Sequence, residues 1–298
     1  MTGTTGNLDY SSFIAMKLKS YYELLKVRLS FLVAFSSGFG YILGNRGVVD
    51  WGILLSFCFG GFLVSGGAIT INQIIEREYD KVMKRTMKRP LPTSRVGKIE
   101  ASIFAVILLF NGFAILFVYT NTLTVLISML SMLLYSFVYT PLKRVGPIAV
   151  FVGAIPGALP PLLGWVAATG QISYEALIIF GIQFIWQFPH FWAIAWLADE
   201  DYKKAGFKLL PANGKKDMRT AINIMIYTLF LLPLGLLPAI IGVTGLNSAI
   251  IATICGVLFL AQTFSLMRDN SRKSALKIMY GSFLYLPVVQ IAYLVDKI

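Results

Sequence analysis

The hydrophobic and polar positions of this chain alternate on the scale of whole segments rather than single residues. Apolar stretches of about 20 residues follow one another, and each is long enough to cross a bilayer as an α-helix. This pattern predicts an all-α, polytopic membrane protein whose nine transmembrane helices form a bundle enclosing a central cavity. The predicted spans are residues 29–45, 52–75, 101–119, 122–140, 148–168, 175–198, 221–241, 248–266 and 278–295.

The nine segments are predicted to form a single transmembrane domain, residues 1–298, because no Pro-, Ser- or Gly-rich linker interrupts them. The two long loops on one side, residues 77–100 and 199–220, follow the second and sixth spans. Long loops in a compact protein tend to carry function. The interval of four spans between them indicates a weak internal repeat, which in a ring of helices would place the two loops opposite one another.

Composition and charge support a membrane location. The chain is 57% hydrophobic and 13% charged, about half the charge of an average soluble domain. With the N-terminus and every second loop taken as cytoplasmic, that side holds all but Arg46 and Lys297 of the 26 basic residues. This asymmetry predicts a multi-pass protein of the inner (plasma) membrane with a cytoplasmic N-terminus and an extracytoplasmic C-terminus. The net charge of +12 then reflects the accumulation of basic residues on the cytoplasmic side of the lipid bilayer, which is the expected partner. No nucleic-acid partner is expected.

A first acidic cluster lies at the end of the second predicted span. Asn72, Glu76 and Asp80 are spaced by four residues, so on a helix each advances about 40° and about 6 Å along one face. Carboxylate and amide oxygens suit a hard cation, and Mg²⁺ shared with a phosphate needs only one or two carboxylates. The alternative is a solvated helix end whose acidic pairs are bridged by Arg77 or Lys84.

A second acidic cluster, Asp199-Glu200-Asp201, ends the sixth predicted span. By itself it is also compatible with an interfacial patch neutralised by Lys203 and Lys204. Taken together with the first cluster, it indicates a pair of acidic sites that can hold two Mg²⁺ ions on one diphosphate.

The single histidine, His190, lies well inside the sixth predicted span. Pro189 cannot donate a hydrogen bond, so the carbonyl of Ile185 loses its helical partner and a kink is expected. A neutral core histidine bonded to a neighbouring helix is one interpretation. A ligand to a haem iron, or an acid/base group facing a cavity, is the other.

Four stretches of the chain resemble a known family. The first acidic cluster continues into a motif similar to the first motif of the intramembrane UbiA-type prenyltransferase superfamily, with Glu76 where much of the superfamily has Asp. Three further stretches narrow the resemblance to its protoheme IX farnesyltransferases. The four stretches are Asn72-x-x-x-Glu76-x-x-x-Asp80-x-x-Met83-x-Arg85-Thr86-x-x-Arg89-Pro90-Leu91, Tyr139-Thr140-Pro141-Leu142-Lys143-Arg144, Gly157-Ala158-Leu159-Pro160-Pro161-Leu162-Leu163-Gly164-Trp165 and Trp186-Gln187-Phe188-Pro189-His190-Phe191-Trp192.

The resemblance implies Mg²⁺-dependent transfer of the farnesyl group of farnesyl diphosphate to a vinyl group of haem B, giving haem O and diphosphate. It also implies a haem A synthase or a terminal oxidase assembly as a candidate partner. The implied catalytic residues are Asn72, Glu76, Asp80 and Asp201, which together with Asp199 are the implied metal ligands. Diphosphate binding is expected from Arg28, Arg85, Lys143 and Arg144, and haem binding from His190 and Trp186.

Two other functions remain compatible with the sequence. One is prenylation of an aromatic or quinone precursor, which would use the same acidic clusters. The other is secondary transport of an anionic substrate, because transporters also contain broken helices and polar residues at membrane depth. A transporter would not need acidic clusters confined to one face.

Overall fold

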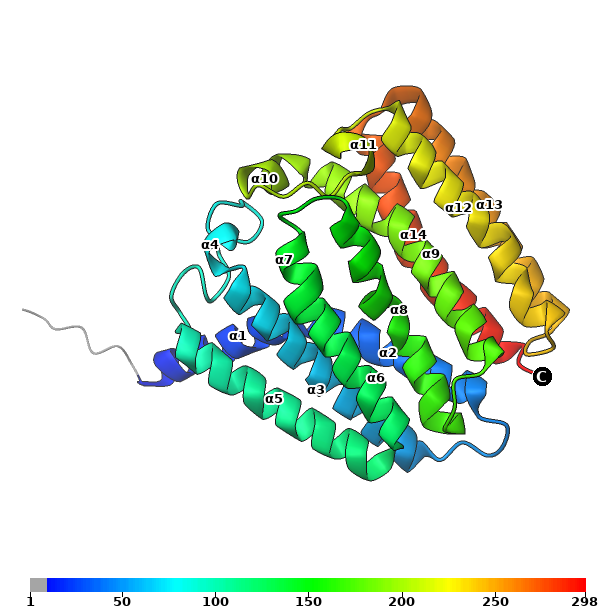
Figure 1. Ribbon diagram of the computed structural model, residues 1–298, viewed down its shortest axis with the longest axis horizontal. Helices are drawn as coiled ribbons and strands as arrows, with labels where there is room; N and C mark the ends of the chain where they lie inside the picture. Colours follow the sequence, from blue (N-terminus) through cyan, green and yellow to red (C-terminus); the bar gives the residue numbers. More distant parts are fainter. Residues whose placement is uncertain (1–9) are drawn as a thin grey trace, which may run out of the picture.

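The computed structural model describes residues 10–298, and this part of the chain is helical without a named strand (Figure 1). Within it nine segments are long and apolar enough to cross a membrane, which confirms the predicted nine-span all-α fold. The part of the predicted domain at residues 1–9 lies outside the described residues. The nine segments are α2 (Val27–Gly44), α3 (Trp51–Ile75), α5 (Lys98–Tyr119), the continuous α6–η1–α7 segment (Thr122–Leu142), α8 (Ile148–Thr169), α9 (Tyr174–Leu197), α12 (Met218–Ile240), α13 (Leu246–Asp269) and α14 (Arg272–Val295).

Shorter helices collect at one end of the bundle, where α4, α7, α10 and α11 lie together in Figure 1. A further helix, α1, was not predicted; it is separated from α2 by a single residue, Lys26, in the left-handed conformation (φ 43°). The bounds of these elements are α1 (Tyr10–Leu25), α4 (Arg77–Asp80), α7 (Thr140–Leu142), α10 (Asp199–Lys204) and α11 (Pro211–Gly214); α6 covers Thr122–Leu133 and η1, a π-helix, covers Leu134–Tyr139.

Both acidic clusters follow the same local geometry. Glu76 separates α3 from α4 with φ −88° and ψ 3°, and Ala198 separates α9 from α10 with φ −98° and ψ 8°. The i to i−4 hydrogen bonds continue through the first break, from Glu76 N to Asn72 O at 2.9 Å and from Asp80 N to Glu76 O at 2.8 Å. The first acidic cluster therefore keeps the helical spacing that the sequence predicted.

The centre of the bundle is α8: 72% of its most hydrophobic 18-residue stretch is buried, compared with 17% for the α6–η1–α7 segment. Close contact between α8 and α2 requires glycine at two positions. A Cβ on Gly40 would lie 1.9 Å from Pro161 O, and one on Gly164 would lie 1.9 Å from Ser37 O. Small residues are the usual means of bringing membrane helices this close.

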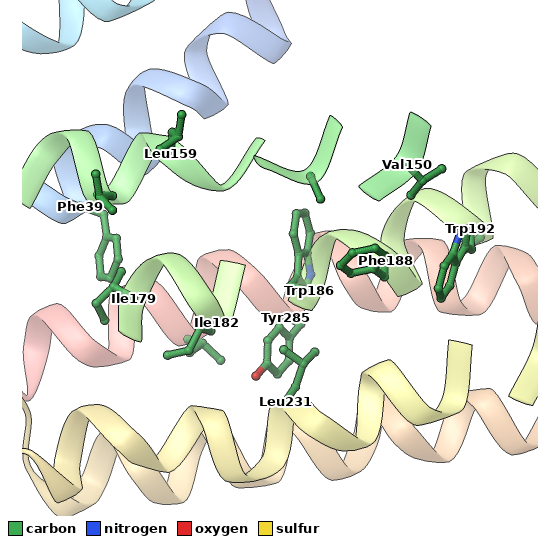
Figure 2. Packing of buried hydrophobic residues seen from close by; sticks show 14 of the residues in the cluster. Phe39, Val150, Leu159, Ile179, Ile182, Trp186, Phe188, Trp192, Leu231 and Tyr285 are labelled. Atoms are coloured by element: carbon green, nitrogen blue, oxygen red, sulfur yellow. The ribbon is translucent and has the colours of Figure 1, made fainter. Parts of the chain in front are cut away.

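The hydrophobic core extends from α8 to its neighbours. Figure 2 shows side chains of α2, α8, α9, α12 and α14 meeting in one layer, among them Phe39, Leu159, Trp186, Leu231 and Tyr285. These contacts hold α9, which carries His190 and leads into the second acidic cluster, between α8, α12 and α14. The enclosed central cavity stays a prediction.

Candidate active site

The first acidic cluster is buried. Asn72, Glu76 and Asp80 are 2%, 5% and 0% exposed, so the solvated helix end considered from the sequence is wrong. The Asn72 side chain donates its Nδ2 proton to Thr140 Oγ1 at 2.9 Å. Glu76 Oε1 lies 2.7 Å from the ammonium of Lys143. Asn72 and Glu76 therefore face the α7 end of the neighbouring segment, and Asp80 is likewise turned away from solvent.

Asp80 has one oxygen that is paired and one that is not. Its Oδ2 lies 2.7 Å from Arg89 Nη1, whereas its buried Oδ1 has no hydrogen-bond partner among the described residues. Burial raises the pKa of Asp80, and the Arg89 guanidinium opposes that shift. A buried carboxylate oxygen without a partner is costly, and a cation bound there would satisfy it.

The second acidic cluster contacts the loop that follows the first. Asp201 Oδ2 accepts a hydrogen bond from the backbone N–H of Arg85 at 3.1 Å, and Arg85 Nη2 donates to Tyr202 OH at 3.1 Å. Asp199 faces elsewhere, with its Oδ2 at 2.8 Å from Lys203 and 3.5 Å from Lys216. The geometry thus places Asp201, and not Asp199, against the loop of the first cluster.

No group of three His, Cys, Asp or Glu side chains within residues 10–298 converges closely enough to form a metal site by itself. The donors that are present are carboxylate and amide oxygens in separate positions. Such a set fits a Mg²⁺ ion that completes its shell with substrate phosphate and water, because Mg²⁺ seldom uses an all-protein cage.

The predicted diphosphate-binding cations other than Arg85 occupy three different environments. Lys143 lies at the first cluster, and its ammonium is also 4.5 Å from the ring centroid of Tyr139. Arg144 instead stacks on Tyr79, with the guanidinium carbon 4.1 Å from the ring centroid. Arg28 is exposed at the start of α2.

Lys26 is a site residue that the sequence analysis missed. Burial lowers its pKa to about 7, with Arg89 and Lys143 adding to the shift and Asp80 and Glu76 opposing it. The Lys26 ammonium therefore belongs to the same group of interacting charges as the first acidic cluster. The signal available in the sequence was its position two residues before Arg28, at the boundary of the first predicted span.

The π-helix η1 supplies an aromatic wall next to the cations. Tyr135 and Tyr139 lie with their ring centroids 5.6 Å apart, deep among the helices yet with part of each side chain accessible. A Cβ on Gly153 would lie 2.6 Å from the Tyr139 ring, so glycine is required for this placement. Single-turn π-helices are frequent at functional sites because they change the direction in which side chains point.

His190 is held by a hydrogen bond to Ser282 of α14. Its Nδ1 lies 2.8 Å from Ser282 Oγ, and the Ser282 hydroxyl donates its only proton to Met279 O at 2.6 Å. With its proton directed to Met279 O, Ser282 Oγ can accept from Nδ1, and in that tautomer the lone pair of the neutral ring is on Nε2. Trp186 stacks on the imidazole, with centroids 4.5 Å apart and planes inclined by 16°.

Fold and site together define a polytopic, all-α membrane protein with a buried cluster of oxygen donors and cations at one end. The sequence profile of the UbiA prenyltransferase family matches residues 32–286. The chain belongs to this family, which confirms the resemblance inferred from the motifs.

The chain is 54% identical to a protoheme IX farnesyltransferase of Cytophaga hutchinsonii, over 96% of this chain and 100% of that protein. Among solved structures it is similar to a digeranylgeranylglyceryl phosphate synthase, with a TM-score of 0.78 and 24% identity over 94% of this chain and 98% of that one. It is also similar to a UbiA homologue from Archaeoglobus fulgidus bound to GPP and Mg²⁺, with a TM-score of 0.64 and 18% identity over 92% of this chain and 99% of that one.

Proposed function

We propose that the protein transfers the farnesyl group of farnesyl diphosphate to a vinyl group of haem B, giving haem O and releasing diphosphate. The observation that carries this proposal is the 54% identity to a protoheme IX farnesyltransferase along almost the entire chain. The buried oxygen donors beside Lys143, Arg89 and Lys26 support it, because an allylic diphosphate needs both metal and protein cations.

Asn72, Glu76, Asp80 and Asp201 are the proposed ligands of Mg²⁺, since the unpaired Asp80 oxygen and the oxygen chemistry of this set fit that ion. When bound, Mg²⁺ supplies positive charge next to the diphosphate oxygens. Asp199 is left out of this set because two lysines already engage it.

The protein cations have a separate task in this proposal. Lys26, Lys143 and Arg85 neutralise the diphosphate oxygens, so that the C–O bond to the farnesyl group breaks with the electron pair remaining on diphosphate. Lys26 takes the place that the sequence analysis gave to Arg28, which faces outward, and Arg144 contributes charge from its position on Tyr79.

The allylic cation formed in this way must be kept from water until the vinyl carbon attacks it. Tyr135 and Tyr139 line the inner side of the site, and the faces of aromatic rings attract a cation. A dry cavity between these rings and α8 is part of the proposal. Addition of water to the neighbouring vinyl carbon, with loss of a proton, completes the hydroxyethylfarnesyl group.

Haem B is proposed to bind near His190 and Trp186. His190 lies nine residues before Asp199, roughly 14 Å along the helix axis, so the haem and diphosphate regions are separated along α9. The lone pair on Nε2 suits an axial ligand to iron, because metal-bound histidines commonly donate their other ring proton to a protein acceptor.

The distribution of basic residues supports a cytoplasmic N-terminus, an extracytoplasmic C-terminus and a location in the inner membrane. We further propose that the chain forms one domain and delivers its product to a haem A synthase or a terminal oxidase assembly.

The test incubates the purified full-length protein with haem B, farnesyl diphosphate and Mg²⁺, followed by mass spectrometry of the extracted haem. The expected result is a haem O mass that depends on all three components. Product formed only with an aromatic or quinone acceptor would contradict the proposal. Substrate flux into vesicles without any covalent product would show a transporter instead.

The haem site is tested by the absorption spectrum of bound haem B. His190→Ala is expected to shift the Soret band, while Phe191→Ala, one residue along the same helix, should leave the iron ligands unchanged. Identical spectra for wild type and His190→Ala would remove the ligand role.

A further inference from the structure

A groove of about 680 Å³ lies on the outside of the bundle, between α1 and the first turns of α5. One wall is formed by Tyr21 of α1 and Phe104 of α5, whose ring centroids are 4.8 Å apart. Arg77, the first residue of α4, also lines the groove. The groove is separate from the candidate active site, because Glu76 points to Lys143 whereas its neighbour Arg77 lines the groove.

The floor of the groove is apolar along the direction of the membrane-spanning helix. Ile99, Ile103 and Ile107 recur every four residues on one face of α5 and are 79%, 57% and 53% exposed. Eight residues of helix correspond to about 12 Å. An extended hydrocarbon chain lying on this face would run parallel to α5.

The end of the groove at the start of α5 carries net positive charge. Among the described residues that line it, the one carboxylate is that of Glu100, which is engaged by the Lys17 ammonium at 2.8 Å and by Tyr21 OH at 2.6 Å. The Lys98 ammonium is exposed and donates no hydrogen bond to a residue in the described range 10–298. The Arg77 guanidinium donates from Nε to Leu91 O at 3.2 Å and from Nη2 to Ser94 Oγ at 3.5 Å, and its Nε lies 3.7 Å from the exposed carboxylate of Glu78.

We propose that this groove binds one anionic phospholipid, with its phosphate at Lys98 and Arg77 and an acyl chain along the three isoleucines. The groove has cations at its mouth and an apolar strip along a spanning helix. This arrangement matches a lipid, whose charged phosphate is followed by an apolar acyl chain. Basic residues at a membrane boundary favour anionic headgroups over zwitterionic ones.

Binding at this position stabilises the loop that carries Arg89. Arg77 holds that loop through Leu91 O, and Arg95 holds it to α1 through Glu23 at 2.6 Å. A phosphate bound to Arg77 would restrict the same segment. The bound lipid is therefore expected to raise the midpoint of thermal unfolding as well as to remain with the protein during purification.

The experiment measures lipid retained by the full-length protein in native mass spectrometry after exchange into detergent with phosphatidylglycerol or phosphatidylcholine. The wild type is expected to retain one phosphatidylglycerol in preference to phosphatidylcholine. Lys98→Gln should lower that retention about fivefold, the effect of one basic residue near a lipid headgroup. Ile103→Trp should lower it by filling the groove while leaving the charge unchanged.

Lys273→Gln is the matched control, because it removes the same charge from an exposed lysine in the first turn of α14. Equal retention of the two lipids by the wild type would overturn the proposal, as would an equal effect of Lys273→Gln and Lys98→Gln. Full retention by Ile103→Trp would show charge attraction without a groove site. Displacement of the lipid by equimolar farnesyl diphosphate would reassign the groove to substrate.

Discussion

Replacing Asp80 by Asn tests the most buried group of the candidate active site. The substitution keeps the shape of the side chain but removes its charge. Asp80 is 0% exposed, its Oδ2 is paired with Arg89 at 2.7 Å, and its Oδ1 has no partner among the described residues. The change therefore affects two interactions, the ion pair with Arg89 and any cation held by Oδ1.

The two effects have different magnitudes. Breaking a buried ion pair by neutralising one partner costs about 3–5 kcal/mol, and the lower end applies because the Arg89 side chain remains 21% exposed. Loss of one electrostatic contact to the transition state lowers kcat by about 10²–10³ fold. We therefore expect Asp80→Asn to be about 3 kcal/mol less stable and to have at least a hundredfold lower kcat.

The assay separates these effects with a second variant. Unfolding in mixed micelles gives stability, and chromatography of extracted haem gives activity. The double variant Asp80→Asn/Arg89→Gln removes both charges and should recover most of the stability, to within about 1 kcal/mol of wild type. It should not recover activity. Asp50→Asn is the control at the opposite end of α3, since Asn is also a good N-cap residue.

Recovery of activity in the double variant would refute the reasoning, because the carboxylate would then serve only to neutralise Arg89. An Asp80→Asn protein that is stable and fully active would refute it as well, by showing that neither the pair nor a bound cation depends on this charge.

Three further predictions concern neighbouring residues. Since the pKa of Lys26 is lowered to about 7, its side chain is mostly neutral at pH 8, so binding of farnesyl diphosphate should take up a proton there and should weaken as the pH rises. Calorimetry in buffers of different ionisation enthalpy should show this proton uptake for the wild type and not for Lys26→Met. Ser282→Ala removes the acceptor that orients His190 and should alter the absorption spectrum of bound haem. Ser282→Thr keeps the hydroxyl and should have the wild-type spectrum, and identical spectra for all three proteins would contradict the hydrogen-bond assignment. Gly153→Ala places a methyl group against the Tyr139 ring and should cost about 1–3 kcal/mol together with a large part of the activity, and a variant as stable and active as wild type would contradict the close contact.

The sequence by itself determined the architecture. Backbone polar groups inside a bilayer must bond within their own segment, so apolar runs of about 20 residues can only become helices. Over residues 10–298 the nine predicted runs form nine spans. It also determined that Asn72, Glu76 and Asp80 share one face, because a spacing of four is a local property of a helix and survives the break at Glu76.

Which partners these residues have was decided only by the tertiary structure. Asn72 bonds Thr140, 68 positions away, and Arg85 bonds Asp201, 116 positions away. Periodicity carries no information about which distant helix will lie alongside, since that depends on close approaches such as the glycine contacts between α2 and α8.

The same reason explains what the sequence analysis missed or left open. Lys26, in the left-handed conformation between α1 and α2, belongs to the charged cluster, whereas Arg28, two positions further on, is exposed. The protonated nitrogen of His190 is set by Ser282, on another helix. The local spacing of the sequence thus determined where the polar and charged residues lie along each helix. The packing of the helices against one another determined which of these side chains meet.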